Sequence, residues 1–364
     1  MRKMSKKWLG PVVAIGVMGA CALAGTAAAE AGSGHSHDVA KPPAFPTFVH
    51  LPADQAAHPG TQNEWWYAVG QLRSHGHRFA YEVQIIRDTN RDGTALVKPA
   101  TEIAITDETT GKYYAQSSAF APDQASFSTT ELDARTPTAT LSGPMNAMRL
   151  HATLPVGSID LTLNANGRVM YPNGTGLMPF LGGSSYYYSL PDVAATGTIV
   201  ENGRSYPVTG RSWLDRQYGD WNWANTQKWT WQALQLSNGD SLNLWDIFSS
   251  GAENSYATVL HTDGTEEVVA VDPLAGGSSG FTTSPTTGQR FATKWRVGIP
   301  GLKAKLTVTA NSPRLQEIQD AGGIFEGAGS VTGTYQGRHI TGQAEVEQLG
   351  NWHPAAPATG TRAR

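Results

Sequence analysis

Apolar and polar residues alternate with a period of two along most of the chain from Glu64 onward, and no long stretch has the 3.6-residue spacing of a helix. This alternation predicts β-strands, because successive side chains of a strand point to opposite faces. The expected strands are 65–73, 78–87, 102–106, 148–154, 158–164, 195–200, 206–215, 230–236, 242–248, 256–261, 267–271, 291–297, 303–309, 329–335 and 338–347.

Turn dipeptides separate many of these segments. Asn-Gly pairs, which adopt the positive φ of tight hairpins, stand between alternating stretches at Asn166-Gly167, Asn202-Gly203 and Asn238-Gly239. The predicted fold class is therefore all-β and antiparallel, with too many strands for one small barrel. We expect two β-barrel or sandwich domains packed side by side, 48–222 and 223–352, with a ligand cleft at their seam near 218–228. Contact between the halves should shield Trp221 and Trp223.

The two ends of the chain have a different composition. Basic residues at positions 2, 3, 6 and 7 precede an apolar run over 8–24 and the small residues Ala27-Ala28-Ala29, which predicts a signal peptide over 1–29. Residues 30–47 are polar and contain prolines, as flexible linkers do, and 353–364 should form a disordered tail. We therefore expect a secreted, extracellular protein; the alternative is a cell-envelope lipoprotein anchored through Cys21.

Charge and cysteine content restrict the partners. Removal of 1–29 leaves 23 basic and 30 acidic residues, so the formal net charge changes from −3 to −7 and no basic surface for nucleic acid is expected. Cys21 is the only cysteine and would leave with the signal, so disulfides and thiol chemistry are not expected. We expect a monomer without a membrane span, whose partner is a hydrophobic small molecule.

The sequence predicts no metal site and no cofactor. His35 and His37 lie in the linker without a third ligand at suitable spacing. The segment 88–93 begins like a calcium loop, but Pro99 occupies the position of the bidentate glutamate, so a strand-connecting turn is favoured. Ser278 lies in a Gly-x-Ser-x-Gly pattern, yet proline and β-branched residues follow where a nucleophile elbow requires a helix, which favours a flexible loop.

The stretch from Gly210 to Trp231 contains the strongest candidate chemistry. In an extended chain, Trp213, Asp215 and Gln217 share one face, so a carboxyl group lies beside an indole. Burial disfavours the charged carboxylate, so Asp215 is a candidate proton donor near neutral pH. The alternative is that the tryptophans form core and Asp215 is a structural partner.

A second acidic residue lies in the aromatic segment 63–67. Alternation places Glu64 and Trp66 on one face and Trp65 and Tyr67 on the other. We predict that Glu64 and Trp66 line the cavity. The alternative is that Glu64 forms an ion pair with an arginine at the barrel mouth.

These motifs resemble the AttH-like, carotenoid hydratase (hydroxyneurosporene synthase) family over roughly residues 58 to 350. The matching segments are Glu64-Trp65-Trp66-Tyr67, Tyr186-Tyr187-Tyr188-Ser189, Gly210-x-x-Trp213-x-Asp215, Trp231-x-x-Leu234-x-Leu236 and Glu326-Gly327…Val331-x-Gly333…Gly337…Gly342…Glu347. The resemblance implies two lipocalin-like domains and hydration of carbon–carbon double bonds; the family also includes kievitone hydratase and many proteins labelled secreted hydrolases. Gln71 departs from the expected pattern, in which many relatives would have a histidine, so a role that requires an imidazole does not carry over to this position.

Two functions of different class follow. In the first, a cofactor-independent hydratase, lyase or isomerase, Asp215 protonates a terpenoid- or polyketide-like alkene and the indoles of Trp213 and Trp66 stabilise the cation. Glu64 would orient or deprotonate the water, a tyrosine of 186–188 would supply a hydroxyl, and Trp231 would line the cavity. In the second, the protein is a non-catalytic, lipocalin-like carrier of the same ligand; a secreted hydrolase is a further alternative.

Overall fold

The computed structural model describes residues 46–350 except 94, 166, 250–251, 313–315 and 320–322. The predictions for the signal peptide, most of the linker and the tail lie outside these residues, as do those for Cys21, His35, His37 and Asn166.

Nearly all of the regular structure is β. The strands of the first sheet are β1 (Asn63–Ser74), β2 (His77–Ile86), β3 (Ala100–Asp107), β4 (Lys112–Ala119), β5 (Ser126–Phe127), β6 (Asp133–Arg135), β7 (Ala139–Ser142), β8 (Met148–Leu154), β9 (Gly157–Ala165), β10 (Leu177–Phe180), β11 (Gly183–Glu201) and β12 (Arg204–Asp220). Those of the second are β13 (Thr226–Leu236), β14 (Ser241–Ser249), β15 (Ala252–Leu260), β16 (Glu266–Ala270), β17 (Ser278–Ser279), β20 (Lys294–Ile299), β21 (Ala304–Ala310), β22 (Glu317–Ile318), β23 (Ile324–Tyr335) and β24 (Arg338–Leu349).

The remaining elements are short. β18 (Thr282–Thr283) and β19 (Arg290–Phe291) pair with each other, and the helical turns are η1 (Ala53–Gln55), η2 (Pro122–Gln124), η3 (Pro172–Gly174), η4 (Trp223–Asn225), α1 (Leu274–Gly277) and η5 (Pro300–Leu302). No helix among the described residues has the length and apolar character needed to cross a bilayer.

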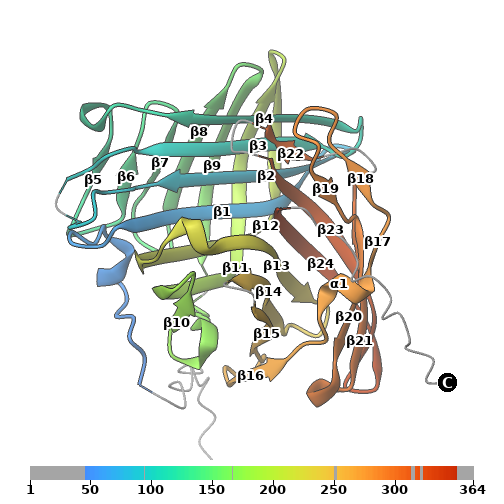
Figure 1. The fold of residues 1–364 in the computed structure, drawn as a ribbon. Coiled ribbons are helices and arrows are strands. Elements are labelled where there is room, and N and C mark those ends of the chain that lie inside the picture. Colours follow the sequence, from blue (N-terminus) through green and yellow to red (C-terminus); the bar gives the residue numbers. More distant parts are fainter. Residues whose placement is uncertain are drawn as a thin grey trace, which may run out of the picture. The chain divides into compact units, whose positions relative to one another are not determined.

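Both large sheets are antiparallel and curled into half-barrels (Figure 1). The first has the order β4-β3-β2-β1-β12-β11-β9-β8-β7-β6-β5, with β10 beside β11, and the second has the order β16-β15-β14-β13-β24-β23-β21-β20-β17, with β22 beside β23. Most strands that follow each other in the sequence also lie side by side in a sheet, so short turns are enough to connect them. The single turn η4 joins the last strand of the first sheet to the first strand of the second.

The strands bury either one face or both. β8 alternates in burial, with Met148 and Leu150 inside and Arg149 and His151 outside, as expected for a sheet with one wet face. In β1, by contrast, residues from 63 to 70 are all buried. One face of β1 packs inside the first half-barrel, and the other packs against the second sheet, so consecutive aromatic residues are stable there.

Burial on both faces produces three apolar cores. One fills the first half-barrel and includes Trp66, Tyr188 and Leu214; another fills the second and includes Leu234 and Trp295. The third lies between the sheets and contains the aromatic residues Trp65, Tyr67, Phe180, Tyr187, Trp213, Trp221, Trp229, Trp231 and Trp245. This inter-sheet core surrounds the candidate site.

The prediction of an all-β, antiparallel fold in two β-barrel or sandwich halves is confirmed, since the structure has two curled half-barrel sheets, and each expected strand overlaps an observed one. The pair Asn202-Gly203 has positive φ at both residues, 49° and 79°, and closes the β11–β12 hairpin. β4 was not predicted, because its residues are mostly half-buried without alternation. At the junction Trp221 is shielded, but the prediction for Trp223 is wrong, since it is 41% exposed.

Candidate active site

The candidate site is built from two rows of cross-strand neighbours that face each other. On the first sheet the register aligns Glu102 with Gln84, Gln84 with Tyr67, and Tyr67 with Asp215. On the second sheet it aligns Glu326 with Glu347, Glu347 with Trp231, and Trp231 with Trp245. The Tyr67 hydroxyl joins the rows by donating a hydrogen bond to Glu326, with an O–O distance of 2.8 Å.

A cavity of about 150 Å³ lies between these rows. Cavities of about this volume bind a benzene-sized ring in other proteins. Its walls combine indoles, carboxyl groups and amides; the lining residues are Trp65, Tyr67, Gln84, Ile86, Asp88, Glu102, Asp215, Gln217, Trp223, Trp229, Trp231, Trp245, Ile324, Glu326, Glu347 and Leu349. Because Trp223 is 41% exposed, it marks the entrance.

Asp215 is held rigidly in this wall. The indole Nε1 of Trp213 donates to Oδ1 at 2.6 Å, and the Tyr187 hydroxyl donates to Oδ2. Asn243 in turn donates to the Tyr187 hydroxyl at 2.6 Å and accepts from Trp231 at 3.2 Å. Burial raises the pKa of Asp215 to about 7, against the opposing hydrogen bonds from Ser189, Tyr187 and Trp213. The carboxyl group can therefore carry and release a proton close to neutral pH.

A second carboxyl group faces Asp215 across the cavity. Trp229 donates to Oε1 of Glu347 at 2.5 Å, and burial raises the Glu347 pKa to about 7, with the charge of Asp215 adding to the rise. Burial likewise raises the pKa of Glu102 to about 8, and it raises that of Glu326 well above the ordinary value. The site thus contains carboxyl groups whose charges oppose one another, so protons are shared among them near neutrality.

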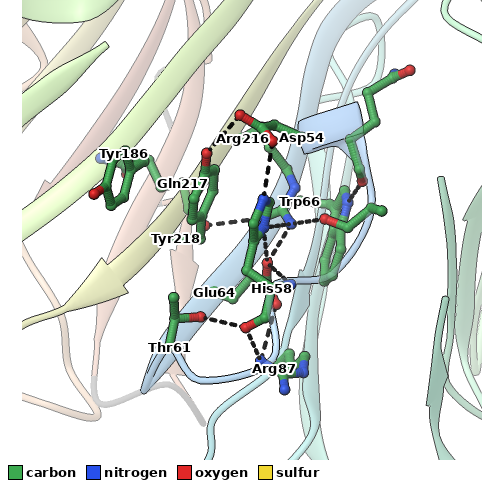
Figure 2. A network of polar contacts seen from close by, with 12 residues as sticks. Asp54, His58, Thr61, Glu64, Trp66, Arg87, Tyr186, Arg216, Gln217 and Tyr218 are labelled. Atoms are coloured by element: carbon green, nitrogen blue, oxygen red, sulfur yellow. Dashed lines mark hydrogen bonds and ion pairs between the residues drawn. The ribbon is translucent and has the colours of Figure 1, made fainter. Parts of the chain in front are cut away.

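Glu64 has a different environment (Figure 2). Its carboxylate pairs with Arg216, with Arg87 at 3.1 Å and with the ring of His58 at 2.8 Å. Burial alone would raise the pKa of Glu64, but Arg216 and His58 outweigh it and lower the pKa to about 2. Glu64 is therefore an ionised structural residue. This pairing matches the alternative reading of the sequence, and the cavity does not include Glu64.

The face assignment for β1 is accordingly corrected. Trp66 points into the core of the first half-barrel, where its Nε1 donates to the Gln55 carbonyl at 3.0 Å and its ring lies 3.9 Å from the Arg216 guanidinium. Trp65 and Tyr67 line the cavity instead. Alternation was predicted correctly, but the face that meets the second sheet was not.

The other predicted site residues lie partly in the cavity wall, partly behind it and partly away from it. Asp215 and Trp231 line the cavity, whereas Trp213 and Tyr187 lie behind Asp215 as hydrogen-bond donors. The remaining tyrosines do not reach it: Tyr188 is core of the first half-barrel and Tyr186 stacks on Tyr218 (Figure 2).

Two further residues singled out in the sequence lie away from the cavity. Gln71 donates to the carbonyls of Gly329 and Ala344 at 3.0 Å and so ties the sheets together. Ser278 donates to the Leu274 carbonyl at 2.7 Å, and the turn α1 precedes it rather than following it, unlike a nucleophile elbow. Among the described residues, no group of three or more His, Cys, Asp or Glu side chains is arranged to hold a metal ion.

Sequence reasoning gave no role to the acids Glu326, Glu347 and Glu102. The first two appear in the terminal motif and align with each other across β23 and β24, but their position opposite Asp215 depends on the packing of two sheets.

The raised pKa values predict an unusual dependence of stability on pH. Asp215, Glu347 and Glu102 have folded pKa values of about 7, 7 and 8, above their ordinary values of 3.8 to 4.5. As pH rises, the unfolded chain therefore loses these protons at a lower pH than the folded protein does. The free energy of unfolding should therefore fall by several kcal/mol as pH rises from about 4 to 8. Urea unfolding followed by tryptophan fluorescence at pH 5, 6.5 and 8 measures this change.

A matched pair of variants tests the cause. Glu347→Gln should equal the wild type at pH 5 and exceed it in stability at pH 8, whereas Glu131→Gln, at an exposed position, should change neither value. A wild type that gains stability between pH 5 and 8 contradicts the assignment of buried, protonated acids.

Known proteins resemble this chain in sequence. The model of the AttH-like family matches residues 42–347. The dehydratase asqC of Emericella nidulans is 24% identical over 55% of this chain and 60% of its own length. Kievitone hydratase of Fusarium solani subsp. phaseoli is 22% identical over 54% of this chain and 58% of its own length. The alignments thus span about three fifths of these relatives.

Solved structures share the fold. The crystal structure of an AttH protein from Nitrosomonas europaea superposes with a TM-score of 0.72 at 22% identity and covers 83% of this chain and 97% of its own. Kievitone hydratase from Nectria haematococca superposes with a TM-score of 0.70 at 17% identity, covering 84% of this chain and 94% of its own. With the family match extending over most of the described residues, the chain belongs to the AttH-like family.

Proposed function

We propose that this protein is a hydratase or dehydratase that adds water to, or removes it from, a carbon–carbon bond of an apolar small molecule without a cofactor. The observation that carries the proposal is the buried carboxyl group of Asp215 in an indole-lined cavity, with its pKa raised to about 7 and with Glu347 across from it. Relatives named as a hydratase and a dehydratase support this class of reaction.

In the hydration direction, the Asp215 proton forms a C–H bond with one alkene carbon as the π bond breaks, which leaves a carbocation on the other carbon. The indole faces of Trp231 and its neighbours stabilise that cation. A water oxygen then bonds to the cation while Glu347, ionised, takes the water proton. Return of this proton to Asp215 through solvent completes the cycle, and the same steps in reverse remove water.

Asp215 suits the role of acid because both of its oxygens already accept hydrogen bonds from fixed donors. These donors hold the carboxyl plane in one orientation, so a proton on a remaining lone pair keeps a constant direction. Glu347 suits the role of base because the charge of Asp215 raises its pKa: when one of the two is ionised, the other is favoured as the neutral acid.

Incubation of the protein with a panel of isoprenoid and polyketide alkenes in H₂¹⁸O tests the proposal. The expected result is a product heavier than its substrate by one labelled water, detected by mass spectrometry. Recovery of an unchanged alkene bound to the protein would refute hydration and favour a carrier that uses the same cavity.

We also propose that the protein is exported, on the strength of the basic start, the apolar run and Ala27-Ala28-Ala29. N-terminal sequencing of protein recovered from the medium should begin at Glu30. Retention of Met1, or a lipid on Cys21, would contradict cleavage after Ala29.

A further inference from the structure

The cavity has an unbalanced set of charges. The side chains that line it include the carboxyl groups of Asp88, Glu102, Asp215, Glu326 and Glu347, but none of the described lining residues is Lys, Arg or His. Inside the first half-barrel, by contrast, a buried acid is balanced by cations, as Glu64 is by Arg216 and Arg87. For the cavity acids, burial instead raises the pKa, to about 6 for Asp88 and to about 8 for Glu102.

One of these acids lacks any partner. Glu102 is 7% exposed, lines the cavity, and has no hydrogen bond or ion pair with a described residue. A polar group largely removed from bulk water normally finds a hydrogen-bond partner in a native protein. The neighbour that aligns with it across the strands, Gln84, lines the cavity too. The free acceptor positions of Glu102 therefore suit a ligand that carries positive charge or hydrogen-bond donors.

The aromatic residues of the cavity favour the same ligand. Five indoles line it: Trp65, Trp223, Trp229, Trp231 and Trp245. The negative faces of aromatic rings attract ammonium groups, and carboxylates beside aromatic rings increase this attraction. An anionic ligand would meet repulsion from each ionised acid and no compensating cation.

We propose that the cavity binds a lipophilic organic cation, with a substituted ammonium group held between Glu102, Glu347 and the surrounding indoles. The inference rests on the proposed function, because a carbocation formed from an alkene carries the same positive charge as such an ammonium ion. It extends that function to amines as inhibitors and to nitrogen-containing alkenes as substrates.

Binding of a cation must compete with protons. The titratable side chains that face the ligand are Tyr67, Asp88, Glu102, Asp215, Glu326 and Glu347. Tyr187 lies behind Asp215, Glu82 raises the pKa of Glu326 from behind, and Lys98 is the cation that acts on Asp88. With the pKa values of Asp215 and Glu347 at about 7, their charges appear as pH rises from 6 to 8, so cation affinity should increase over that interval.

The test compares two ligands of nearly equal shape, benzyltrimethylammonium and neopentylbenzene, in which a quaternary carbon replaces the charged nitrogen. Neither ligand titrates, so any effect of pH comes from the protein. Calorimetry and tryptophan quenching at pH 8 should show the ammonium ion binding at least about tenfold more tightly, with affinity about tenfold lower at pH 6. The affinity of neopentylbenzene should not change with pH.

Variants locate the effect. Glu347→Gln should weaken benzyltrimethylammonium binding at pH 8 by about fivefold and leave neopentylbenzene unaffected, and exposed Glu131→Gln should leave both unchanged. Equal affinity of the two ligands for the wild type overturns the inference without any variant. Selective ammonium binding in a protein that incorporates no ¹⁸O would leave the cation site standing and refute the hydratase.

Discussion

Asp215→Asn is expected to reduce turnover by about a hundredfold or more, because it removes the proton that starts the reaction. The amide has nearly the same shape as the carboxyl group. Its oxygen can accept from Trp213 Nε1, and its NH₂ group can donate to the Tyr187 hydroxyl after that hydroxyl rotates. Ligand binding and folding should therefore persist while the chemical step is lost.

The pH dependence distinguishes this role from a structural one. In the wild type, turnover should fall as pH rises through about 7, where Asp215 loses its proton. The residual activity of Asp215→Asn should lack that fall. Asp123→Asn removes a carboxylate from the exposed turn η2 and should behave as the wild type. Full activity of a folded Asp215→Asn variant on a confirmed substrate would show that another group supplies the proton.

Asp215 was identifiable from the sequence because the grouping of residues on one face of a strand does not depend on which sheet that face meets. The same spacing of two that places Trp213 beside Asp215 also places Gln217 on that face, and the structure has Asp215 and Gln217 in one wall. The many tryptophans around these two residues then predict that they are buried, and burial disfavours the charged form of Asp215.

The face of β1 was not identifiable in this way. Glu64 and Trp66 alternate with Trp65 and Tyr67, and both pairs contain large aromatic residues because both faces are buried. Alternation divides such a strand into two faces without saying which meets the other sheet. The deciding contact is Arg216, which follows Asp215 and points to the opposite face, where it pairs with Glu64.

Predicting the acids on the second sheet that face Asp215 required still more information. Glu326 and Glu347 align with each other through the register of β23 and β24, which a hairpin predicts, but they meet Asp215 and Tyr67 only because the two half-barrels pack face to face. The sequence distance between Tyr67 and Glu326 is 259 residues, and no local pattern encodes such a contact.

Arg216→Met should be the most destabilising of the substitutions considered. Arg216 is fully buried, and besides its pair with Glu64 it donates to the Ala56 carbonyl at 2.6 Å and lies over the ring of Trp66 (Figure 2). Methionine fills much of the same volume but leaves Glu64 with only Arg87 and His58. Loss of one partner of a buried ion pair costs about 3–5 kcal/mol, and the remaining contacts of Glu64 place this case near the lower value.

The decrease in the free energy of unfolding at acid pH, the acid limb of the stability profile, provides an independent measurement of this ion pair. The folded pKa of Glu64 is about 2 against an ordinary value of 4.5, so its pairing contributes about 3 kcal/mol above pH 4.5, and this contribution is lost as pH falls towards 2. Arg216→Met should flatten that limb, and Glu64→Gln should abolish it. The double variant should lose less stability than the two single variants lose together, because each single change breaks the same ion pair. Unfolding of Arg216→Met at the same urea concentration as the wild type would show that Arg87 and His58 alone hold Glu64 ionised.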